Sequence, residues 1–412
     1  MPPVPTDPIP TANLPTDRRA MLAGIGGLAA GAILVGKANA GPLNPPAGPV
    51  APTPGPEPRT PINSVNTPGN ANSLFKITQS GSYYLTGNIT GVAGKSGIEI
   101  AADNVTIDMM GFSLIGVPSA GSGITVAEGG NWLSMTIRNG KITEWGKSGV
   151  ELSFGLSTRS FNAIIENIQA SKNGESGLNC GRFGIIRHCV TDGNTLSGIA
   201  AIDGLVESCT SSRNGSRGIT SALVIKSCTA SENGADGLNA TSGGVITQST
   251  SSNNAGNGIY TGQGTTISEC SAYANVEFGI YASQRCTIVN NSVAYSGLDN
   301  IQVNKDCIVR GNVSSSAGIL SSGASSLGAG IKVTGANNLI EENNFTECDW
   351  GVLVTGANNF ITRNTCSNNT LNWSVVANNK CLVVLGLNSG AISGNSGGTS
   401  PGSTNPNANY TY

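Results

Sequence analysis

The sequence has little charge and few aromatic side chains. Asp, Glu, Lys and Arg together make up 11% of its 412 residues, aromatic residues make up 5%, and there is one histidine. Ordinary globular domains carry about 25% charged residues, so this composition argues against a helical or α/β enzyme. The formal net charge of −2 provides no basic surface, and we therefore expect no nucleic-acid partner.

The first 40 residues resemble an export signal. Arg18 and Arg19 precede a short apolar run that contains several glycines and ends in an Ala-Asn-Ala motif. The run is short for a membrane span, although a retained anchor remains the alternative. The pattern is similar to a twin-arginine (Tat) signal peptide, cleaved after Ala40. We expect export to the periplasm, the cell surface or the medium, with no integral membrane span once the signal is removed.

Two further segments have the composition of connecting chain. Residues 41–61 contain nine prolines, which predicts an extended linker. Residues 391–412 are rich in Gly, Ser and Asn, which predicts a flexible C-terminal tail. The folded domain is therefore predicted at 62–390, with its first residues covering one end of the fold.

A signature of glycine followed by an aliphatic residue recurs along this domain. From Gly177 to Asn300 the spacing is 19 to 21 residues, and each repeat holds two or three short β-prone runs separated by Gly, Asn and Ser. Helical repeats are longer and need a 3.6-residue apolar period, which is missing. The pattern predicts an all-β fold, a single-stranded parallel β-helix of about 12 coils of about 21 residues.

Two columns of aliphatic residues appear when the repeats are aligned. The first follows the signature glycine and comprises Ile124, Val150, Leu178, Ile199, Ile219, Leu238, Ile259, Ile280, Ile301, Ile331 and Val352. The second comprises Ile186, Val206, Ile225, Ile246, Ile267, Ile288, Val309, Ile340 and Ile361. Both columns are predicted to face the core, where each residue stacks on its copy in the next coil and buries apolar surface.

Several cysteines occupy one column of the repeat. Three residues after the second aliphatic column stand Cys189, Cys209, Cys228, Ser249, Cys270, Asn291, Asn312, Asn343 and Asn364. A position that accepts Cys, Ser or Asn needs a small side chain that stacks and hydrogen-bonds at a turn. Metal ligands converge on a point, whereas these residues run in a line, so we predict no metal site. Thiol redox chemistry, or a disulfide formed after export, remains the alternative.

The segment 74–117, LFKITQSGSYYLTGNITGVAGKSGIEIAADNVTIDMMGFSLIGV, is similar to the opening of exported bacterial β-helix repeat proteins. With the columns, residues 62–385 resemble the right-handed parallel β-helix superfamily, whose members include pectate lyases and polygalacturonases. The resemblance implies a right-handed helix. It implies little about activity, because one fold hosts many functions.

The chemistry of those two enzyme groups is not evident in the sequence. His188 lies between Arg187 and Cys189, so the Gly-His-Gly element of polygalacturonases is absent. Calcium-dependent lyases need clustered acidic oxygens and a basic residue that takes a proton. The acidic residues here are scattered, so calcium is conceivable but unsupported, and no cofactor is identified.

Charged residues alternate in sign along two outward columns, one through Arg187, Glu207 and Lys226 and the other through Asp192. Read as a lyase-like patch, Arg187 or Lys226 acts as base, and Glu207 or Asp192 holds a cation. Read as structure, they form ion pairs between coils. The alternation favours the structural interpretation.

Tyr260 and Tyr281 are candidates for stacking on a sugar chain, and the longer segments at 153–161 and 314–330 for the edges of a cleft. Two functions remain open. One is a secreted protein that binds or processes an extracellular polysaccharide or surface glycan, a uronate-type polymer with lyase-like chemistry at most. The other is a non-catalytic surface, adhesion or structural protein.

Overall fold

The computed structural model describes residues 58–153, 160–318, 327–385, 392–394 and 407–412. The predicted signal with Arg18, Arg19 and Ala40, and most of the proline-rich linker, lie outside the described residues. The described part is built of short strands and turns, and none of it forms a helix long and apolar enough to cross a membrane. Residues 57–412 form one compact unit.

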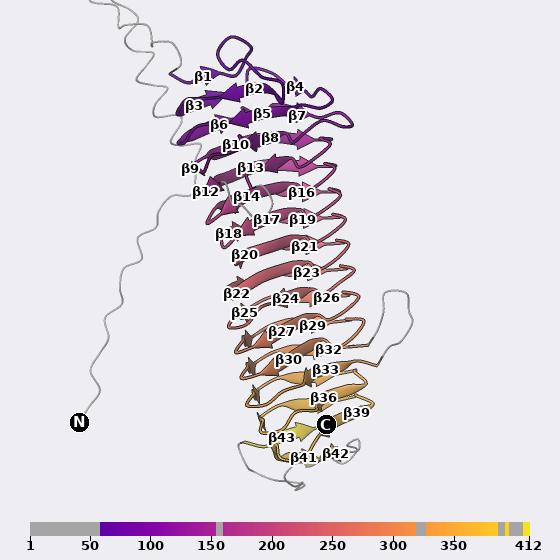
Figure 1. The fold of residues 1–412 in the computed structure, drawn as a ribbon. Helices are drawn as coiled ribbons and strands as arrows, with labels where there is room; N and C mark the ends of the chain where they lie inside the picture. Colours follow the sequence, from indigo (N-terminus) through magenta and orange to yellow (C-terminus); the bar gives the residue numbers. More distant parts are fainter. Residues whose placement is uncertain (1–57, 154–159, 319–326, 386–391, 395–406) are drawn as a thin grey trace, which may run out of the picture. The chain divides into compact units, whose positions relative to one another are not determined.

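The strands stack coil upon coil into a rod (Figure 1). All pairings between named strands are parallel, and they form three long ladders, numbered in the order in which the chain visits them. The first ladder contains β2 (Ser73–Ile77), β5 (Ser96–Ile100), β8 (Ile124–Val126), β11 (Val150–Glu151), β14 (Leu178–Arg182), β17 (Ile199–Ile202), β20 (Ile219–Lys226), β22 (Leu238–Thr247), β24 (Ile259–Thr261), β27 (Ile280–Gln284), β30 (Ile301–Lys305), β33 (Ala329–Val333), β36 (Trp350–Val354), β39 (Leu371–Val375) and β42 (Ile392–Gly394).

The second ladder shares the long strands β20 and β22 with the first. It contains β1 (Thr60–Pro61), β3 (Gly81–Tyr84), β6 (Val105–Asp108), β10 (Thr136–Thr143), β13 (Ile164–Ser171), β15 (Ile185–Arg187), β18 (Leu205–Glu207), the ends of β20 and β22, β25 (Thr266–Ser268), β28 (Thr287–Val289), β31 (Ile308–Arg310), β34 (Leu339–Glu341), β37 (Phe360–Thr362) and β40 (Lys380–Cys381).

The third ladder shares β10 and β13 with the second. It contains β4 (Ile89–Thr90), β7 (Ser113–Ile115), the ends of β10 and β13, β16 (Val190–Asp192), β19 (Thr210–Ser212), β21 (Thr229–Ser231), β23 (Thr250–Ser252), β26 (Ser271–Tyr273), β29 (Ser292–Ala294), β32 (Val313–Ser315), β35 (Asn344–Thr346), β38 (Thr365–Ser367), β43 (Asn409–Thr411) and β41 (Val383–Leu385). The short strands β9 (Trp132–Leu133) and β12 (Ser160–Phe161) pair beside the first ladder, next to β14.

The predicted parallel β-helix is confirmed, with a few more coils than expected. The first ladder has fifteen strands in the described residues, whereas about 12 coils were expected. The three extra strands, β2, β39 and β42, lack the glycine-aliphatic signature from which the coils were counted.

Both aliphatic columns face the core, as predicted. Every member of the first column pairs in register in the first ladder, and every member of the second pairs in the second ladder, with side chains at most 1% exposed. The signature glycine is required by close packing. A Cβ on Gly177 would lie 2.6 Å from the Gly198 carbonyl oxygen and 2.9 Å from Asn194 Nδ2.

The turns between ladders carry lines of buried, hydrogen-bonded side chains. In the turn from the second to the third ladder, the Cys/Ser/Asn column forms such a line: the amide of Cys270 donates to Asn291 Oδ1, and the amide of Asn291 donates to Asn312 Oδ1, each at 2.9 Å. Where the column contains cysteine, Cys189 N donates to Cys209 Sγ at 3.5 Å. The interpretation of these cysteines as packing residues is consistent with this geometry.

Two further lines of this kind were not predicted. One, in the turn from the third to the first ladder, includes Asn173, Asn194, Asn214, Asn233, Asn254 and Asn275. The other, in the turn from the first to the second ladder, includes Cys286, Cys307, Asn338, Asn359 and Asn379. Each buried side chain accepts from the amide of its copy in the preceding coil, so the turns satisfy their own backbone groups.

The structure differs from the sequence-based boundaries at both ends of the domain. Thr60 and Pro61, placed in the linker, form β1 and pair with β3. Within the segment assigned to a flexible tail, residues 392–394 and 409–411 form β42 and β43. Asn409 and Thr411 are 0% and 4% exposed, because their side chains complete contacts with earlier coils. A composition rich in Gly, Ser and Asn is shared by the coils themselves and so did not distinguish a tail.

Candidate functional site

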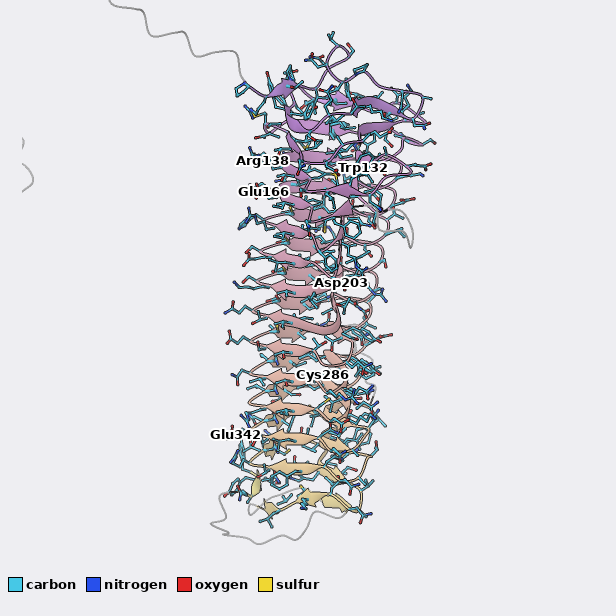
Figure 2. The ribbon with its side chains drawn as sticks, turned by 60° about the vertical axis from the view of Figure 1, so that its left-hand side comes forward. Trp132, Arg138, Glu166, Asp203, Cys286 and Glu342 are labelled. Carbon is cyan, nitrogen blue, oxygen red and sulfur yellow. The ribbon has the colours of Figure 1, made fainter. Side chains whose placement is uncertain are left out.

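Three of the four charged candidates form one line on the outward face of the second ladder. Arg187, Glu207 and Lys226 pair in register on successive coils. Lys226 Nζ lies 3.1 Å from Glu207 Oε1, and Arg187 Nη2 lies 2.6 Å from Glu166 Oε2. The same line includes Arg138, which lies beside Glu166 on the neighbouring coil (Figure 2) and forms an ion pair with Asp108 of the preceding coil at 3.1 Å. The charges therefore neutralise one another between coils.

The fourth candidate, Asp192, lies on the third ladder and is not brought to the other three. It pairs in register with Ser171 and Ser212, so its in-register neighbours are not charged residues of alternating sign. Its carboxylate still forms an ion pair with Arg213, at 2.7 Å. The structure therefore does not bring these four residues together around one ligand position.

Tyr260 and Tyr281 lie on the outward face of the first ladder and pair in register. Their rings stack on each other with centroids 5.2 Å apart and an interplanar angle of 3°. Tyr260 is 38% exposed. The pair thus presents ring edges and hydroxyl groups along the rod, and part of each ring face is already covered.

The same outward face of the first ladder carries a polar groove near the N-terminal coils, which the sequence reasoning missed. The groove has a volume of about 570 Å³. Its floor includes Glu99 and Thr125, which follow the aliphatic residue of their signatures and pair in register. The next residue of this column, Glu151, pairs with Thr125 but is not among the residues that line the groove. Polar and charged residues of the surrounding strands and turns line it, among them Asn70, Asn72, Lys76, Ser96, Ser119, Ser122, Glu128 and Lys147.

Glu99 is a buried carboxylate at one end of this floor. Burial alone would raise its pKa, but hydrogen bonds from Lys76 and Asn70, with the charge of Lys76, hold the pKa below its ordinary value. Lys76 Nζ lies 2.8 Å from Oε1, and Asn70 Nδ2 donates to Oε2 at 3.0 Å. Glu99 is therefore ionised at neutral pH.

Glu151, two coils further along, has the opposite preference. Burial raises its pKa to about 7, and the nearby Glu175 carboxylate adds to the rise. The Ser148 hydroxyl lies 3.0 Å from Glu151 Oε2 and 3.5 Å from Glu175 Oε2. Asn179 Nδ2 and the amide of Ser153 donate to Glu151 Oε1 at 3.0 and 3.1 Å. The carboxyl is held in place and can gain or lose a proton near neutral pH.

The pKa values of the two glutamates are shifted in opposite directions. In-register residues two coils apart have Cα atoms about 10 Å from each other. Carboxyl groups whose surroundings push their pKa values apart are suited to act as acid and base. The sequence signal was the glutamate in SGIEI and SGVEL, a position that is neither acidic nor constant in the later signatures.

The ten cysteines are buried and free of disulfide bonds. Burial raises the pKa of Cys180 to about 12 and that of Cys270 to about 11. Cys286 is an exception, because the hydrogen bond from the Cys307 thiol lowers its pKa, but this residue is 1% exposed. The thiols are therefore poorly placed to meet a solute.

No group of three or more His, Cys, Asp or Glu side chains converges on a point in the part of the chain that the structure describes. Buried acids elsewhere on the rod are engaged by bases of neighbouring coils. Asp236 binds Arg217, at 3.1 Å, and Asp299 binds Lys332, at 3.4 Å.

Comparisons with solved structures find β-helix proteins at low sequence identity. The A-module of mannuronan C-5 epimerase AlgE6 from Azotobacter vinelandii is 14% identical, with a TM-score of 0.43 over 81% of this chain and 91% of that chain. A mutant tailspike protein of the E. coli bacteriophage HK620, in complex with a pentasaccharide, is also 14% identical, with a TM-score of 0.44 over 81% of this chain and 71% of that chain. No curated protein matches the sequence.

The family comparison agrees with the observed coils. Residues 90–266 match the model described as the right handed beta helix region. This range runs from the end of β4 to the start of β25, and the coils beyond it continue the same three ladders. The described residues therefore have the fold of a right-handed parallel β-helix.

Proposed function

We propose that this is an exported protein whose first-ladder groove binds or processes an extracellular polysaccharide, in its finer form a uronate-type polymer. The observation that carries the proposal is the outward column of the first ladder, with Glu99 in the groove lining as a carboxylate and Glu151, two coils further along, with a pKa of about 7. The column is outward and its later members are not acidic, so the stacking of coils does not in general require glutamate at this position.

The groove suits an extended polar ligand. Amide and hydroxyl groups along the floor and walls can bind sugar hydroxyls, and Lys76 and Lys147 line it with positive charge. The floor column continues along the rod to Tyr260, seven strands beyond Glu99, which is about 34 Å. A polymer that follows the rod axis would meet both regions.

A lyase-like step would use the two glutamates in turn. In elimination on a uronate, C5 loses a proton to a base, and the glycosidic oxygen leaves with a proton supplied by an acid. Glu151 can hold that proton at neutral pH, and Glu99 is an ionised carboxylate beside the Lys76 ammonium. This assignment replaces Arg187, Glu207, Lys226 and Asp192 as the favoured residues.

The test is an assay on uronate polymers, with and without calcium, that follows the ultraviolet absorbance of unsaturated products. For a lyase, Glu151→Gln is expected to lower the rate at least 100-fold, and the matched control Glu207→Gln to leave it unchanged. A protein that gives no product, but binds glycans on an array in a manner lost with Glu99→Gln, is a binding protein of the proposed kind. Absence of both product and groove-dependent binding contradicts the proposal.

A non-catalytic surface or adhesion role is the second candidate. The paired charges of the second ladder favour it, because a long outward face there is arranged for stability between coils. Binding of a glycan or a cell surface that survives Glu99→Gln and Glu151→Gln would support this role.

Export is tested at the signal. Replacing Arg18 and Arg19 by lysine is expected to keep the precursor in the cytoplasm, whereas replacing Lys37 by glutamine leaves export intact. Fractionation followed by immunoblotting reads the result, and normal export of the double lysine variant would contradict a twin-arginine signal.

A further inference from the structure

The last strand in the sequence, β43, does not lie at the end of the third ladder but between two earlier strands. Elsewhere in the third ladder each strand pairs with the strands of the preceding and following coils. At the end, β43 lies between β38 and β41, two strands that belong to successive coils formed earlier in the chain. The two coils are therefore separated here by the width of one strand, and we call this space the strand slot.

The strand slot binds β43 through its backbone on both sides. The amide of Tyr410 donates to Asn364 O, and the amide of Asn409 donates to Leu382 O, each at 2.8 Å. This is the way in which sheets accept an added strand.

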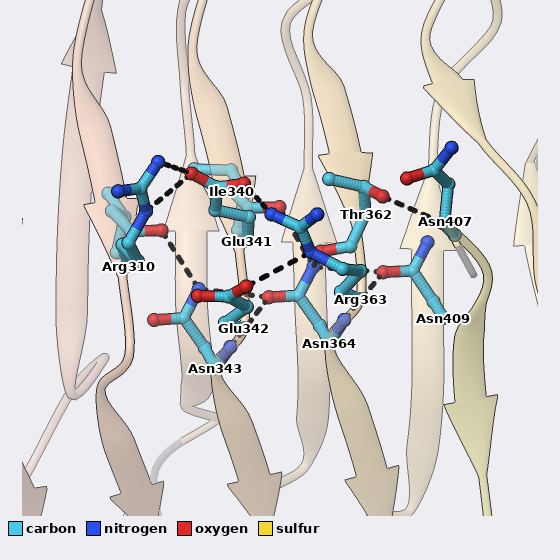
Figure 3. Close-up of polar contacts among 11 residues, drawn as sticks. Arg310, Ile340, Glu341, Glu342, Asn343, Thr362, Arg363, Asn364, Asn407 and Asn409 are labelled. Atoms are coloured by element: carbon cyan, nitrogen blue, oxygen red, sulfur yellow. Dashed lines mark hydrogen bonds and ion pairs between the residues drawn. The ribbon is translucent and has the colours of Figure 1, made fainter.

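One side chain of β43 completes the line of asparagines in the turn from the second to the third ladder. Asn409 Oδ1 accepts from both the amide and Nδ2 of Asn364, at 3.0 and 2.9 Å. Asn409 Nδ2 donates to Ile361 O at 2.8 Å and to Leu382 O at 3.0 Å. Figure 3 shows Asn343, Asn364 and Asn409 in succession, although the last two are 45 residues apart.

A second side chain serves a buried indole. Thr411 Oγ1 accepts from Trp373 Nε1 at 2.7 Å, and Trp373 is 0% exposed. Between these two anchors, Tyr410 is 38% exposed. Alternation along the strand thus places Asn409 and Thr411 inward and leaves the residue between them outward. Without β43, Asn364 and Trp373 would keep buried donors without these acceptors, which is costly.

We propose that the strand slot is an acceptor site for an extended peptide carrying Asn and Thr two residues apart, and that a second copy of this chain can supply that strand in place of β43. All the contacts above come from three residues of one short strand, so the same contacts form when the strand belongs to another copy. An exchange of identical elements between copies keeps every interaction and costs only the difference in effective concentration. Two rods exchanged in this way would be joined at their C-terminal coils.

The first test uses the full-length chain and a fluorescent peptide of residues 405–412, NPNANYTY. The full-length double variant Asn409→Ala/Thr411→Val has a weakened strand of its own and is expected to bind the peptide at least tenfold more tightly than the wild type does. The same peptide with Asn409→Ala is expected to bind at least tenfold more weakly. A folded double variant that ignores the peptide, or binds a scrambled peptide equally well, overturns the acceptor site.

The second test addresses the second copy. Wild-type protein is concentrated, warmed below its unfolding temperature, cooled and diluted, and its mass is measured by light scattering after size-exclusion chromatography. Dimers that slowly return to monomer, and are suppressed by excess peptide, are expected. A wild type that stays monomeric, or a double variant that forms the same dimers, shows that the slot accepts no second copy.

Discussion

The coils from β5 to β14 and those from β15 to β32 share the same inward columns but differ on their outward faces. In the coils from β15 to β32, outward charges form pairs such as Lys226 with Glu207, and the turn from the third to the first ladder repeats asparagine from coil to coil through Asn275. In the earlier coils, the outward column of the first ladder changes from Glu99 to Thr125 to Glu151, and beside it lies the groove.

This difference separates the residues that the stacking of coils requires from those that it does not require. A side chain that contacts its own copy in the next coil is selected for self-complementarity, which explains asparagine lines and paired charges. A carboxyl with a pKa of about 7 is unfavourable for stability at neutral pH, because burial disfavours its charge. Departure from repetition, together with such a residue, is why we place function in the earlier coils.

The largest expected effect on stability lies in the turn from the second to the third ladder, in its line of Cys, Ser and Asn side chains. Asn343 accepts from the amide and Nδ2 of Asn312, and donates to Val309 O, all at 2.9 Å. Asn343→Ala should therefore lower the unfolding free energy by about 4 kcal/mol, since several buried groups lose partners. Chemical denaturation followed by circular dichroism measures this.

The matched control is Cys209→Ser in the same column, where Ser249 already serves as acceptor for the amide of Cys228 at 3.1 Å. We expect a cost below about 1 kcal/mol. Equal costs for the two variants would show that this column is not held by hydrogen bonds.

The next effect tests a substitution within the repeat. Asn300 stands where other coils have the signature glycine. Ala317 stands at a position of the asparagine line in the turn from the third to the first ladder. Asn300 Oδ1 accepts from the amide of Ser296 at 3.2 Å, and its Nδ2 donates to Ser314 Oγ at 3.0 Å. Asn300→Gly is expected to cost about 3 kcal/mol, and Ala317→Asn added to it to recover most of the loss. A double variant no more stable than Asn300→Gly would refute this compensation.

A smaller effect, on the pH dependence of stability, is expected at Glu151. The folded-state pKa of Glu151 is raised to about 7 from an ordinary 4.5, so the native state binds more protons than the unfolded state between these values. Its contribution to stability is therefore lost as pH rises from about 4.5 to 7, by no more than about 3 kcal/mol, and the profile stays constant above. Glu151→Gln should flatten this part of the stability profile, whereas Glu207→Gln should not. Parallel profiles for Glu151→Gln and the wild type would contradict the raised pKa.

The smallest effect is expected at the paired charges of the second ladder. Lys226 and Glu207 are exposed partners, and such pairs contribute about 0.5 kcal/mol or less. Lys226→Gln should change thermal stability by only a degree or so and leave glycan binding unaltered. A large loss of glycan binding would show that the outward face of the second ladder takes part in binding.

The parts of the structure that could be predicted are those that repeat. The inward columns through Ile199 and Val206 had to be aliphatic in every coil, so alignment alone revealed both them and the turn column of Cys209. Outward residues need not repeat. In the aligned sequence, nothing distinguishes Glu151 from the other variable outward residues, so the groove was not predicted. The charges of Arg187 and Glu207 alternate in a pattern, and they were therefore considered as candidates.

The amino-acid sequence by itself determined that the chain forms a parallel β-helix, because stacking of identical coils imposes a period that any alignment detects. Only the tertiary structure decided where Glu151 acquires its surroundings and where β43 enters the third ladder. Glu175 and Asn179 of the next coil meet Glu151 beside Ser148 of its own coil, and Asn409 meets Asn364 across 45 residues. Such contacts depend on distance in space, which the spacing of residues along the chain does not encode.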